Sequence, residues 1–527
     1  MAARRSLVDR LVTTAPCVRL RMPPRHLRVV GQRGVATSAS ACAYEHGFSR
    51  SKPLVSEPWR ATRLQHQWRL FSTPASSAPS SIPPFAFAFD IDGVLLHVNE
   101  PIPGAAAALR HLHRLNIPFI LLTNGGGRYE ADRVADLQRR LGLDLESSTD
   151  THDSDCAGPL PVLTTANFVQ SHTPFQELLD NAAGLDAAAT GAIEGGNSNS
   201  STSTSTSTST GSTAGLRDQT ILVTGSDAAR IRVIAEQYGF RSVITPADIL
   251  AAYPAIYPFD PLLKSVYAGT ARPLPKPLLL EGGKLASHPS AAPFSPSDLD
   301  DSKYLRIAAA FVFNDPRDWA LDIQILTDVL QARRGFLGTF DPASLSADGS
   351  EGGTRLFFSN SDLLWATTYH LPRFGQGAFA AAVAGVWAQM ASAEQPPLLS
   401  PAGGRSTLLG KPHAATYRFA ERTLLRYRAS LLAAHGSNLA SSTTTEAPLQ
   451  TVYMVGDNPE SDIAGANQFS SAHGTDWCSV LVETGVYDPN RDGSSPDYLR
   501  HRPRAIVSDV GAAVRWALQR EGWPADF

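Results

Sequence analysis

FAFAFDIDG, at residues 85–93, is the stretch that decides the fold. Its five successive apolar residues, three of them phenylalanine, are typical of a strand buried on both faces of a parallel sheet. Asp90 and Asp92 follow, and side chains two apart on an extended chain point the same way, so both carboxylates can converge. Gly93 lets the backbone turn there. The pair could act as nucleophile and proton carrier, although acids at such positions more often cap turns or helices.

The residues after this stretch continue a β-α-β-α pattern. An alanine-rich helix is expected next, then a second buried strand at IPFILLT (117–123), and another helix after GGG (125–127). This alternation predicts a parallel sheet wrapped by helices, with active-site residues outside the carboxyl ends of its strands. Thr123 and Asn124 close the second strand. A hydroxyl and exposed amides before a helix can cradle a phosphate, and a simple capped turn is the alternative.

The last part of the chain returns to the same pattern. Lys411 follows a glycine in LLGKPH, at the start of an expected helix, where a cation is disfavoured unless a bound anion compensates it. A solvated surface lysine is the alternative. Asp457 and Asp462 lie in MVGDNPESD, again after a strand. Carboxylates at that place suit magnesium, which prefers oxygen ligands, although Asp462 could instead cap the next helix.

A second α/β unit is expected between these two parts. TILVTG (220–225), RIAAAFVFND (306–315) and RLFFSN (355–360) are its expected strands, with helical spacing between them. The Ser/Thr/Gly tract at 195–215 cannot bury side chains and is expected to be an insertion. The predicted organisation is a leader and linker over 1–80, a first core part over 81–150, an inserted α/β domain over 151–404 with the low-complexity insertion near 185–217, and a second core part over 405–527.

The composition argues against several classes of protein. With 46 Lys and Arg against 49 Asp and Glu, the net charge is −3, so no nucleic-acid partner is expected. The four cysteines are scattered without a CxxC pair, which argues against a disulfide framework or a cysteine-rich zinc site. The longest apolar stretch, GAFAAAVAGVWAQMA (377–391), is too short to cross a bilayer, so no transmembrane segment is expected.

The first 40 residues differ in character from the rest. They contain eight arginines, no lysine and a single acid, Asp9, among many serines, alanines and threonines. This composition is typical of a mitochondrial presequence and predicts a mitochondrial location, with the matrix as the expected compartment. A disordered basic tail is the alternative interpretation.

The four polar motifs occur in the order of the haloacid dehalogenase (HAD) superfamily, which the chain resembles over roughly 80–520. DIDG, TN, the lysine of GKP and GDNPESD correspond to its motifs one to four. The insertion between motifs two and three resembles the type-2A cap of the NagD and p-nitrophenyl phosphatase group, in subclass IIA. Further segments are similar to the cat eye syndrome critical region protein 5-like mitochondrial family, namely SHTPF (171–175), FNDPRDW (313–319), SNSDLLW (359–365) and RFGQGAF (373–379).

The resemblance implies a Rossmann-like core with a large α/β cap and a magnesium-dependent phosphatase. Asp90 would attack phosphorus to form an aspartyl phosphate, and Asp92 would protonate the leaving oxygen and then activate water. It implies that Mg²⁺ is held by Asp90, the backbone carbonyl of Asp92 and Asp457, with Asp462 ordering the surrounding ligands. The phosphoryl oxygens would be bound by Thr123, the amide of Asn124 and Lys411.

Within the cap, the resemblance implies a substrate contact from Asn360 and Asp362. They occupy the place of an Asn-Pro-Asp element, with Ser361 in place of the proline. The expected partner is a small phosphorylated metabolite of unspecified identity. A catalytically weak or inactive protein with a binding or regulatory role is the alternative. A dinucleotide-binding oxidoreductase is disfavoured, because no GxGxxG follows a strand.

Overall fold

The computed structural model describes most of the chain after the predicted leader. The described residues are 82–143, 161–182, 185, 215–259, 261, 263–279, 299–345, 353–365, 367, 369, 371–391, 397–399, 405–436, 447–489 and 501–527. The predicted presequence and linker over 1–80 and nearly all of the Ser/Thr tract lie outside these residues.

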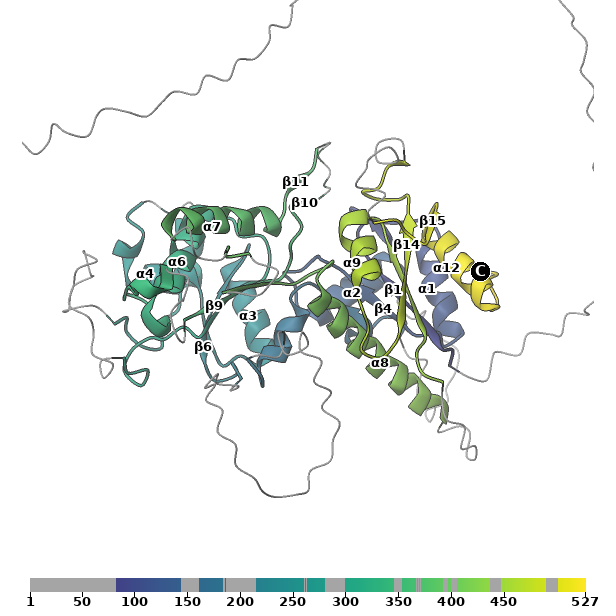
Figure 1. The fold of residues 1–527 in the computed structure, drawn as a ribbon, viewed down its shortest axis with the longest axis horizontal. Helices are drawn as coiled ribbons and strands as arrows, with labels where there is room; N and C mark the ends of the chain where they lie inside the picture. The colour runs from purple at the N-terminus through teal and green to yellow at the C-terminus, as the bar shows by residue number, and fades with distance from the viewer. Residues whose placement is uncertain are drawn as a thin grey trace, which may run out of the picture. The chain divides into compact units, whose positions relative to one another are not determined.

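The core is a parallel sheet of six strands in the order β15-β14-β13-β1-β4-β5 (Figure 1). Every neighbouring pair in it is parallel. The strands are β1 (Phe85–Phe89), β4 (Phe119–Leu122), β5 (Phe168–Val169), β13 (Thr451–Gly456), β14 (Asp476–Val482) and β15 (Ala505–Val507). The helices of this part are α1 (Ala105–Arg114), α2 (Glu130–Arg140), α8 (Ala414–Gly436), α9 (Ala464–Gln468) and α12 (Val510–Glu521).

The alternation of phenylalanine and alanine in β1 makes the two faces of the core sheet different. Phe85, Phe87 and Phe89 point to the face covered by α1 and α12, where they are fully or almost fully buried. Ala86 and Ala88 point to the opposite face, which packs against α8. Because alanine is small, the long helix α8 can lie close to the sheet on that side, and its N-terminus is carried to the strand ends.

The inserted domain, called the cap from here on, has its own parallel sheet in the order β12-β9-β8-β6-β7. Its strands are β6 (Thr220–Thr224), β7 (Ser242–Ile244), β8 (Ala309–Val312), β9 (Arg355–Phe358) and β12 (Ser406–Leu408). Its helices are α3 (Ala228–Tyr238), α4 (Pro246–Ala252), α5 (Lys264–Thr270), α6 (Trp319–Gln331) and α7 (Gln376–Met390). Two parallel sheets with helices on their faces confirm the predicted α/β fold.

Short elements complete the described part of the chain. Two antiparallel ribbons pair β2 (Leu96–His97) with β3 (Glu100–Pro101), and β10 (Leu364–Trp365) with β11 (Arg373–Phe374). The short helices are η1 (Thr165–Asn167), η2 (Thr173–Leu178), η4 (Pro254–Ile256), η7 (Arg333–Gly335), η8 (Pro342–Leu345) and η9 (Pro459–Ile463).

The chain leaves the core sheet for the cap sheet, and later returns to it, further along the sequence than the predicted boundaries at 150 and 404. Phe168–Val169, expected in the inserted domain, pairs with β4 in the core sheet. Ser406–Leu408, expected in the core, pairs with β9 in the cap sheet. Both strands are only two or three residues long, and strands that short carry too little periodicity to be assigned to a sheet from the sequence.

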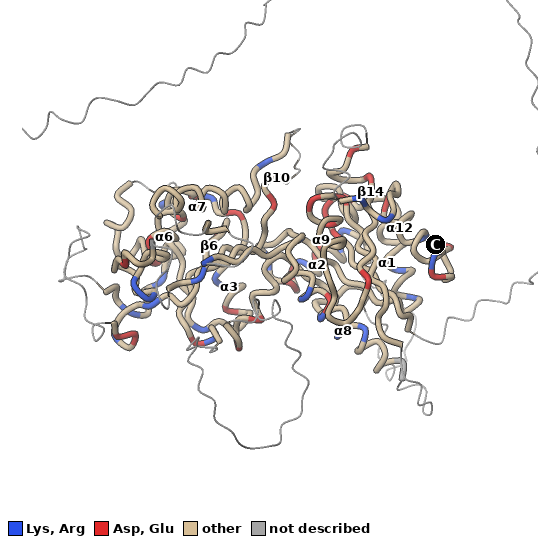
Figure 2. The backbone as a smooth tube through the Cα atoms, viewed as in Figure 1, with Lys and Arg blue, Asp and Glu red and all other residues tan. Residues whose placement is uncertain are grey.

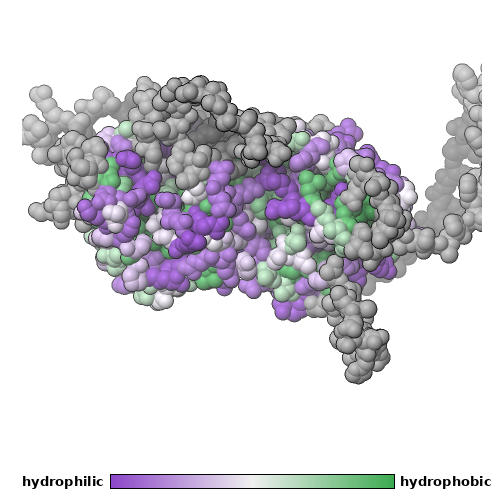
Figure 3. Space-filling view, turned by 90° about the horizontal axis from the view of Figure 1, so that it is seen from below, coloured by the Kyte–Doolittle hydropathy of each residue, from purple (hydrophilic) through white to green (hydrophobic). Residues whose placement is uncertain are grey.

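Charged and apolar side chains are intermixed on the surface. Lysine, arginine, aspartate and glutamate are interspersed over the helices and loops of both parts, whereas the strands of the two sheets carry very few charged residues (Figure 2). The face seen in Figure 3 is largely hydrophilic with small apolar patches. Among the residues that the structure describes, no helix combines the length and apolar character needed to cross a membrane.

Candidate active site

The register of the core strands brings three of the predicted motifs to one edge. Phe89 pairs with Val455 on one side and with Leu121 on the other. The residues that follow these strands, at 90–92, 123–124 and 457, therefore leave the sheet at the same level. The amide of Asp90 still donates to the carbonyl of Val455 at 2.9 Å. This is the carboxyl edge at which parallel sheets commonly bind ligands.

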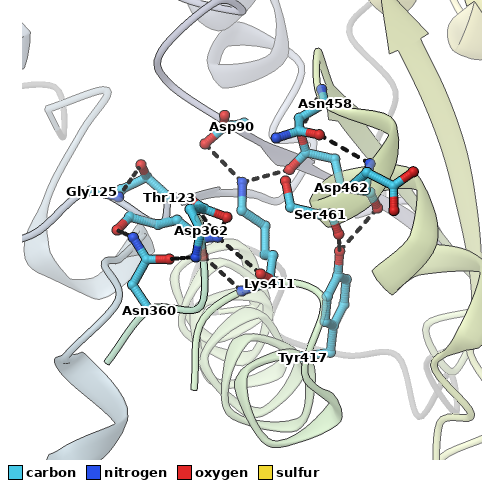
Figure 4. A network of polar contacts seen from close by, with 12 residues as sticks. Asp90, Thr123, Gly125, Asn360, Asp362, Lys411, Tyr417, Asn458, Ser461 and Asp462 are labelled. Carbon is cyan, nitrogen blue, oxygen red and sulfur yellow. Dashed lines mark hydrogen bonds and ion pairs between the residues drawn. The ribbon is translucent and has the colours of Figure 1, made fainter. Parts of the chain in front are cut away.

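Three buried carboxylates meet at this edge. The ammonium group of Lys411 lies between two of them, Asp90 and Asp462 (Figure 4). One oxygen from each of Asp90, Asp457 and Asp462 lies within 4.8 Å of the others. The Nζ atom of Lys411 is 2.8 Å from Asp90 Oδ1 and 2.6 Å from Asp462 Oδ1. Lys411 is 1% exposed, so the alternative of a solvated surface lysine is wrong.

The electrostatics of this cluster are dominated by burial and mutual repulsion. Burial, followed by the charges of Asp90 and Asp462, raises the pKa of Asp457 well above its ordinary value. Burial also raises the pKa of Asp462, against the opposing effect of Lys411. For Lys411, burial disfavours the charged form, but the carboxylates of Asp462 and Asp90 outweigh it and raise the pKa of the ammonium. When ionised, three carboxylates and one ammonium carry a net charge of −2.

This donor set fits a divalent cation. Magnesium prefers carboxylate, carbonyl and water oxygens, and a charge of +2 would balance the cluster. Asp462 is also held from the backbone, because its Oδ2 accepts from the amide of Asn458 at 3.1 Å. The alternative that Asp462 only caps the next helix does not account for its ion pair with Lys411.

The loop after β14 holds Asp457 in place, and sequence reasoning assigned it no role. The amide of Val486 donates to Asp457 Oδ2 at 2.6 Å, and the amide of Tyr487 donates to the Asp457 carbonyl at 3.1 Å. A Cβ atom on Gly485 would lie 2.0 Å from Asp457 Oδ2, and one on Gly93 would lie 2.4 Å from it. Both glycines are therefore needed for this carboxylate to rest against bare backbone. The glycine in VETGVY was the signal that could have identified this loop.

Thr123 and Asp92 lie beside the glycine loop that follows β4. The hydroxyl of Thr123 accepts from the amide of Gly125 at 3.0 Å. A Cβ atom on Gly125 would lie 3.3 Å from Thr123 Oγ1 and 3.7 Å from Asp92 Oδ2, which places both side chains next to this loop. The Asp92 side chain reaches solvent, yet the protein around it limits its hydration. This desolvation, and then the charge of Asp90, raises the pKa of Asp92.

Asn124, between β4 and the glycine loop, connects this part of the core to Lys411 and to the cap. Its side-chain oxygen accepts from the amide of Lys411 at 2.7 Å, and its Nδ2 donates to the Lys411 carbonyl at 2.9 Å. The same Nδ2 lies 3.0 Å from both carboxylate oxygens of Asp362. Asn360 Nδ2 donates to the Asn124 carbonyl at 3.1 Å. The two cap residues singled out from the sequence thus reach the core through Asn124.

The carboxyl group of Asp362 differs from an ordinary surface aspartate. Desolvation raises its pKa to about 6, against the opposing effects of the Asn124 hydrogen bond and the Lys411 charge. Its own amide donates to Asn360 Oδ1 at 2.7 Å, so the two side chains are ordered as a unit. A desolvated and ordered carboxyl group of this kind, beside the glycine loop that follows β4, is typical of functional sites.

Comparison with known proteins agrees with this arrangement. The profile of haloacid dehalogenase-like hydrolases matches residues 87–241, and a HAD-hydrolase-like profile matches residues 408–513. A mitochondrial hydrolase of Saccharomyces cerevisiae is 32% identical over 441 residues, which are 82% of this chain and 96% of the yeast protein. The chain belongs to the haloacid dehalogenase-like hydrolases.

Other matches of this HAD hydrolase cover a smaller share of the related protein or have a lower sequence identity. A fusion of CMP-forming cardiolipin synthase and mitochondrial hydrolase from Schizosaccharomyces pombe is 30% identical over 86% of this chain and 56% of the fusion protein. Among solved structures, p-nitrophenyl phosphatase from Archaeoglobus fulgidus is 14% identical, with a TM-score of 0.41 over 83% of this chain and 100% of that one. NagD from Escherichia coli is 15% identical, with a TM-score of 0.38 over 81% of this chain and 96% of that one.

A buried hydrogen-bond relay joins the glycine loop of the hydrolase to its cap. The amide of Gly127 donates to His172 Nε2 at 3.1 Å, so Nδ1 carries the proton of the neutral ring. Nδ1 then donates to the Tyr238 oxygen at 2.6 Å, and the Tyr238 hydroxyl donates to Glu130. Thr173 donates to the same Glu130 oxygen at 2.7 Å. The relay starts at the glycine loop, passes through helix α3 of the cap, and returns to helix α2, which follows that loop.

His172 is therefore a structural residue, and sequence reasoning missed its partners Glu130 and Tyr238. Burial lowers the pKa of His172 to about 4, below the ordinary value of 6.5, and Glu130 only partly opposes this. Between pH 4 and pH 6.5, the unfolded chain therefore binds more protons at His172 than the folded chain does. Stability is retained above pH 6.5 and is lost as the pH falls toward 4.

We expect this effect to appear in the pH dependence of unfolding. Between pH 7 and 5, His172 should contribute a loss of about 2 kcal/mol in the free energy of unfolding. His172→Gln should remove that contribution, so its stability should fall less steeply over the same range. Urea titrations of both proteins at several pH values measure the difference, and parallel pH profiles would contradict the assignment.

Proposed function

We propose that this HAD hydrolase is a magnesium-dependent phosphohydrolase that cleaves a phosphomonoester through an aspartyl-phosphate intermediate. The observation that carries the proposal is the convergence of Asp90, Asp457 and Asp462 at the carboxyl edge of the core sheet, where Lys411 is ion-paired with Asp90 and Asp462. A carboxylate can attack an anionic phosphate only where positive charge screens both groups. This cluster combines the carboxylate of Asp90, at the end of β1, with the ammonium of Lys411. Its other carboxylates would bind a metal ion as a second cation.

In the proposed reaction, Asp90 Oδ attacks phosphorus and the bond from phosphorus to the leaving oxygen breaks. Asp92 donates its proton to that oxygen, which departs as an alcohol. The resulting carboxylate of Asp92 then takes a proton from water, whose oxygen attacks the phosphorus of the aspartyl phosphate. Inorganic phosphate leaves and Asp90 is restored. The raised pKa of Asp92 favours the protonated form that the first step needs.

The phosphoryl oxygens would be bound by Thr123, the amide of Asn124 and Lys411. Asp90, the backbone carbonyl of Asp92 and Asp457 would hold Mg²⁺, and Asp462 would orient the surrounding ligands. The ion would neutralise the charge that develops on the phosphoryl oxygens. Asn360 and Asp362 would meet the leaving group from the cap, which suits a small phosphorylated metabolite.

We also propose that the protein acts in mitochondria, with the matrix as its compartment. The two relatives are named mitochondrial hydrolases, and the arginine-rich, acid-poor leader is of the type imported there. Expression of the full chain with a C-terminal tag, followed by cell fractionation and protease protection of isolated mitochondria, tests this. A cytosolic pool with an uncleaved leader would refute it.

The proposed function is tested by incubating the purified protein with a panel of phosphomonoesters, with Mg²⁺ or with EDTA. We expect release of inorganic phosphate that requires the metal. Rapid acid quenching should trap a phosphorylated chain, with the phosphate on Asp90 by mass spectrometry. Failure to hydrolyse any member of a panel that covers lipid, sugar and nucleotide phosphates would favour the alternative of a binding or regulatory protein on this fold.

A narrower prediction concerns Asp457 and the metal. Because Asp457 is buried beside Asp90 and Asp462, Asp457→Asn should remove a metal ligand and leave the nucleophile intact. We expect activity to become undetectable at ordinary Mg²⁺ concentrations, and calorimetry should show Mg²⁺ affinity lowered by at least about ten-fold. Asp476→Asn, at an exposed carboxylate paired with Arg504, is the matched control. Unchanged metal affinity in Asp457→Asn would refute the assignment.

A further inference from the structure

The β10–β11 ribbon of the cap concentrates exposed apolar side chains. Leu364 pairs with Phe374 and Trp365 with Arg373, and the ribbon extends beyond the N-terminal end of α7 (Figure 1). Of the fourteen large apolar residues that are exposed in the described part of the chain, six lie between 363 and 374, each 45–70% exposed. They are Leu363, Leu364, Trp365, Tyr369, Leu371 and Phe374. Contiguous exposed apolar surface of this kind marks an interaction site.

Both faces of the ribbon carry this apolar surface. Leu364 and Trp365 are consecutive in a strand and so point to opposite faces, and both are exposed. A partner that packs on one face would leave the other in water, whereas the interface of a lipid bilayer can surround both. The indole N–H of Trp365 donates to the Phe374 carbonyl at 3.3 Å. Its polar atom is thus satisfied inside the ribbon, so the ring can leave water at low cost.

The charge of the ribbon suits an anionic lipid surface. The described residues between 363 and 374 include Arg373 and no aspartate or glutamate, in a chain whose net charge is −3. The guanidinium of Arg373 lies 4.6 Å from the centre of the Tyr369 ring, so cation and aromatic ring are presented together. Leucine and aromatic side chains combined with arginine are typical of segments that lie in the headgroup region of a bilayer.

The ribbon is continuous with the candidate active site. Leu363 directly follows Asp362, whose carboxylate contacts Asn124 at the carboxyl edge of the core sheet. The amide of Gly377 donates to the Asp362 carbonyl at 2.9 Å, which anchors the foot of the ribbon to helix α7. A recess of about 230 Å³ opens at this foot and is lined by Asp315, Pro316, Arg317, Trp319, Phe374, Gly375 and Phe379. The exposed apolar side chains therefore begin directly after Asp362, the residue proposed to meet the leaving group.

We propose that the β10–β11 ribbon docks on the surface of a lipid bilayer and that the substrate is a phosphomonoester whose apolar tail stays in that bilayer. The phosphate would enter the site at Asp90 while the tail runs along the ribbon. This inference rests on the proposed function for its substrate, whereas the docking itself can be measured without turnover.

The docking is tested by flotation of the full chain with vesicles of phosphatidylcholine and phosphatidylglycerol. The salt concentration is about 0.5 M, which screens attraction of the basic leader to the lipid. The parent should float with the vesicles, and the double variant Trp365→Ser/Phe374→Ser should lose at least about ten-fold in the bound fraction. The matched control, Val386→Ser/Met390→Ser, removes two exposed apolar residues from the far part of α7 and should float like the parent.

The substrate class is tested by comparing two substrates. For the ribbon variant, the rate on phosphatidic acid in the same vesicles should fall at least about ten-fold relative to the rate on soluble p-nitrophenyl phosphate. Failure of the parent to float, flotation of the ribbon variant like the control, or equal rate losses on both substrates would each overturn the inference. A parent dimer that the ribbon variant dissociates, without flotation, would assign the ribbon to a second copy instead. Absence of turnover on every phosphomonoester would refute the proposed function while leaving the flotation result meaningful.

Discussion

Replacing Asp90 with asparagine is expected to lower kcat for phosphomonoester hydrolysis by at least about 10³-fold. Asparagine has nearly the same size but no anionic oxygen, so it cannot form the aspartyl phosphate. The Asp90 side chain lies 2.8 Å from the ammonium of Lys411, and the amide oxygen of asparagine can still accept from that group. The loss should therefore be chemical rather than structural. Initial rates under saturating Mg²⁺ measure it, and acid quenching should trap no phosphorylated chain.

The stability of the Asp90→Asn protein shows whether its loss of activity is chemical or structural. Removing one of three buried carboxylates relieves repulsion with Asp457 and Asp462, so in EDTA the midpoint of thermal unfolding should be unchanged or higher. Asp301→Asn, at an exposed surface carboxylate, should leave both rate and stability unchanged. Wild-type activity in Asp90→Asn would mean that another group attacks phosphorus. A much lower melting temperature would mean that Asp90 is mainly structural.

The second large effect is expected from Lys411→Met, which should reduce both stability and activity. The change leaves Asp462 and Asp90 without the only cation that contacts them among the described residues. Removing one partner of a fully buried ion pair costs about 3–5 kcal/mol. The rate should fall at least about 100-fold even where the protein is folded, because charge on the phosphoryl oxygens is uncompensated. Urea unfolding and initial rates measure the two effects separately.

The pH dependence of Lys411→Met provides an internal check. Without the ammonium, which lowers the pKa of Asp462 against the effect of burial, Asp462 should take up a proton at higher pH than it would in the unfolded chain. A raised folded pKa adds stability as the pH falls, so the deficit relative to the parent should shrink at low pH. Lys303→Met, at an exposed lysine paired with Asp300, is the matched control. A rate change under about 10-fold in Lys411→Met would contradict its proposed contact with the phosphate.

Much of the core and the candidate site could be predicted from local sequence patterns. FAFAF places a buried strand directly before Asp90, and its Phe/Ala alternation already implies two unlike faces. Polar motifs come directly after apolar strands at Asp90, Thr123 and Asp457, and parallel strands end at one edge of their sheet. Those facts depend only on neighbours along the chain and on the geometry of parallel pairing, so the sequence by itself determined that these motifs meet.

Contacts between segments that are far apart in the sequence depend on how the helices, strands and loops pack together. Only the tertiary structure therefore decided them. The side chain of Asn124, to which the sequence assigned no partner, bonds the backbone of Lys411 and the carboxylate of Asp362. Gly485 is required because Asp457 lies against it, and His172 is buried because Tyr238 of the cap covers it. No local pattern encodes such pairs, because each arises when two elements far apart in sequence are packed together and their polar groups must be satisfied.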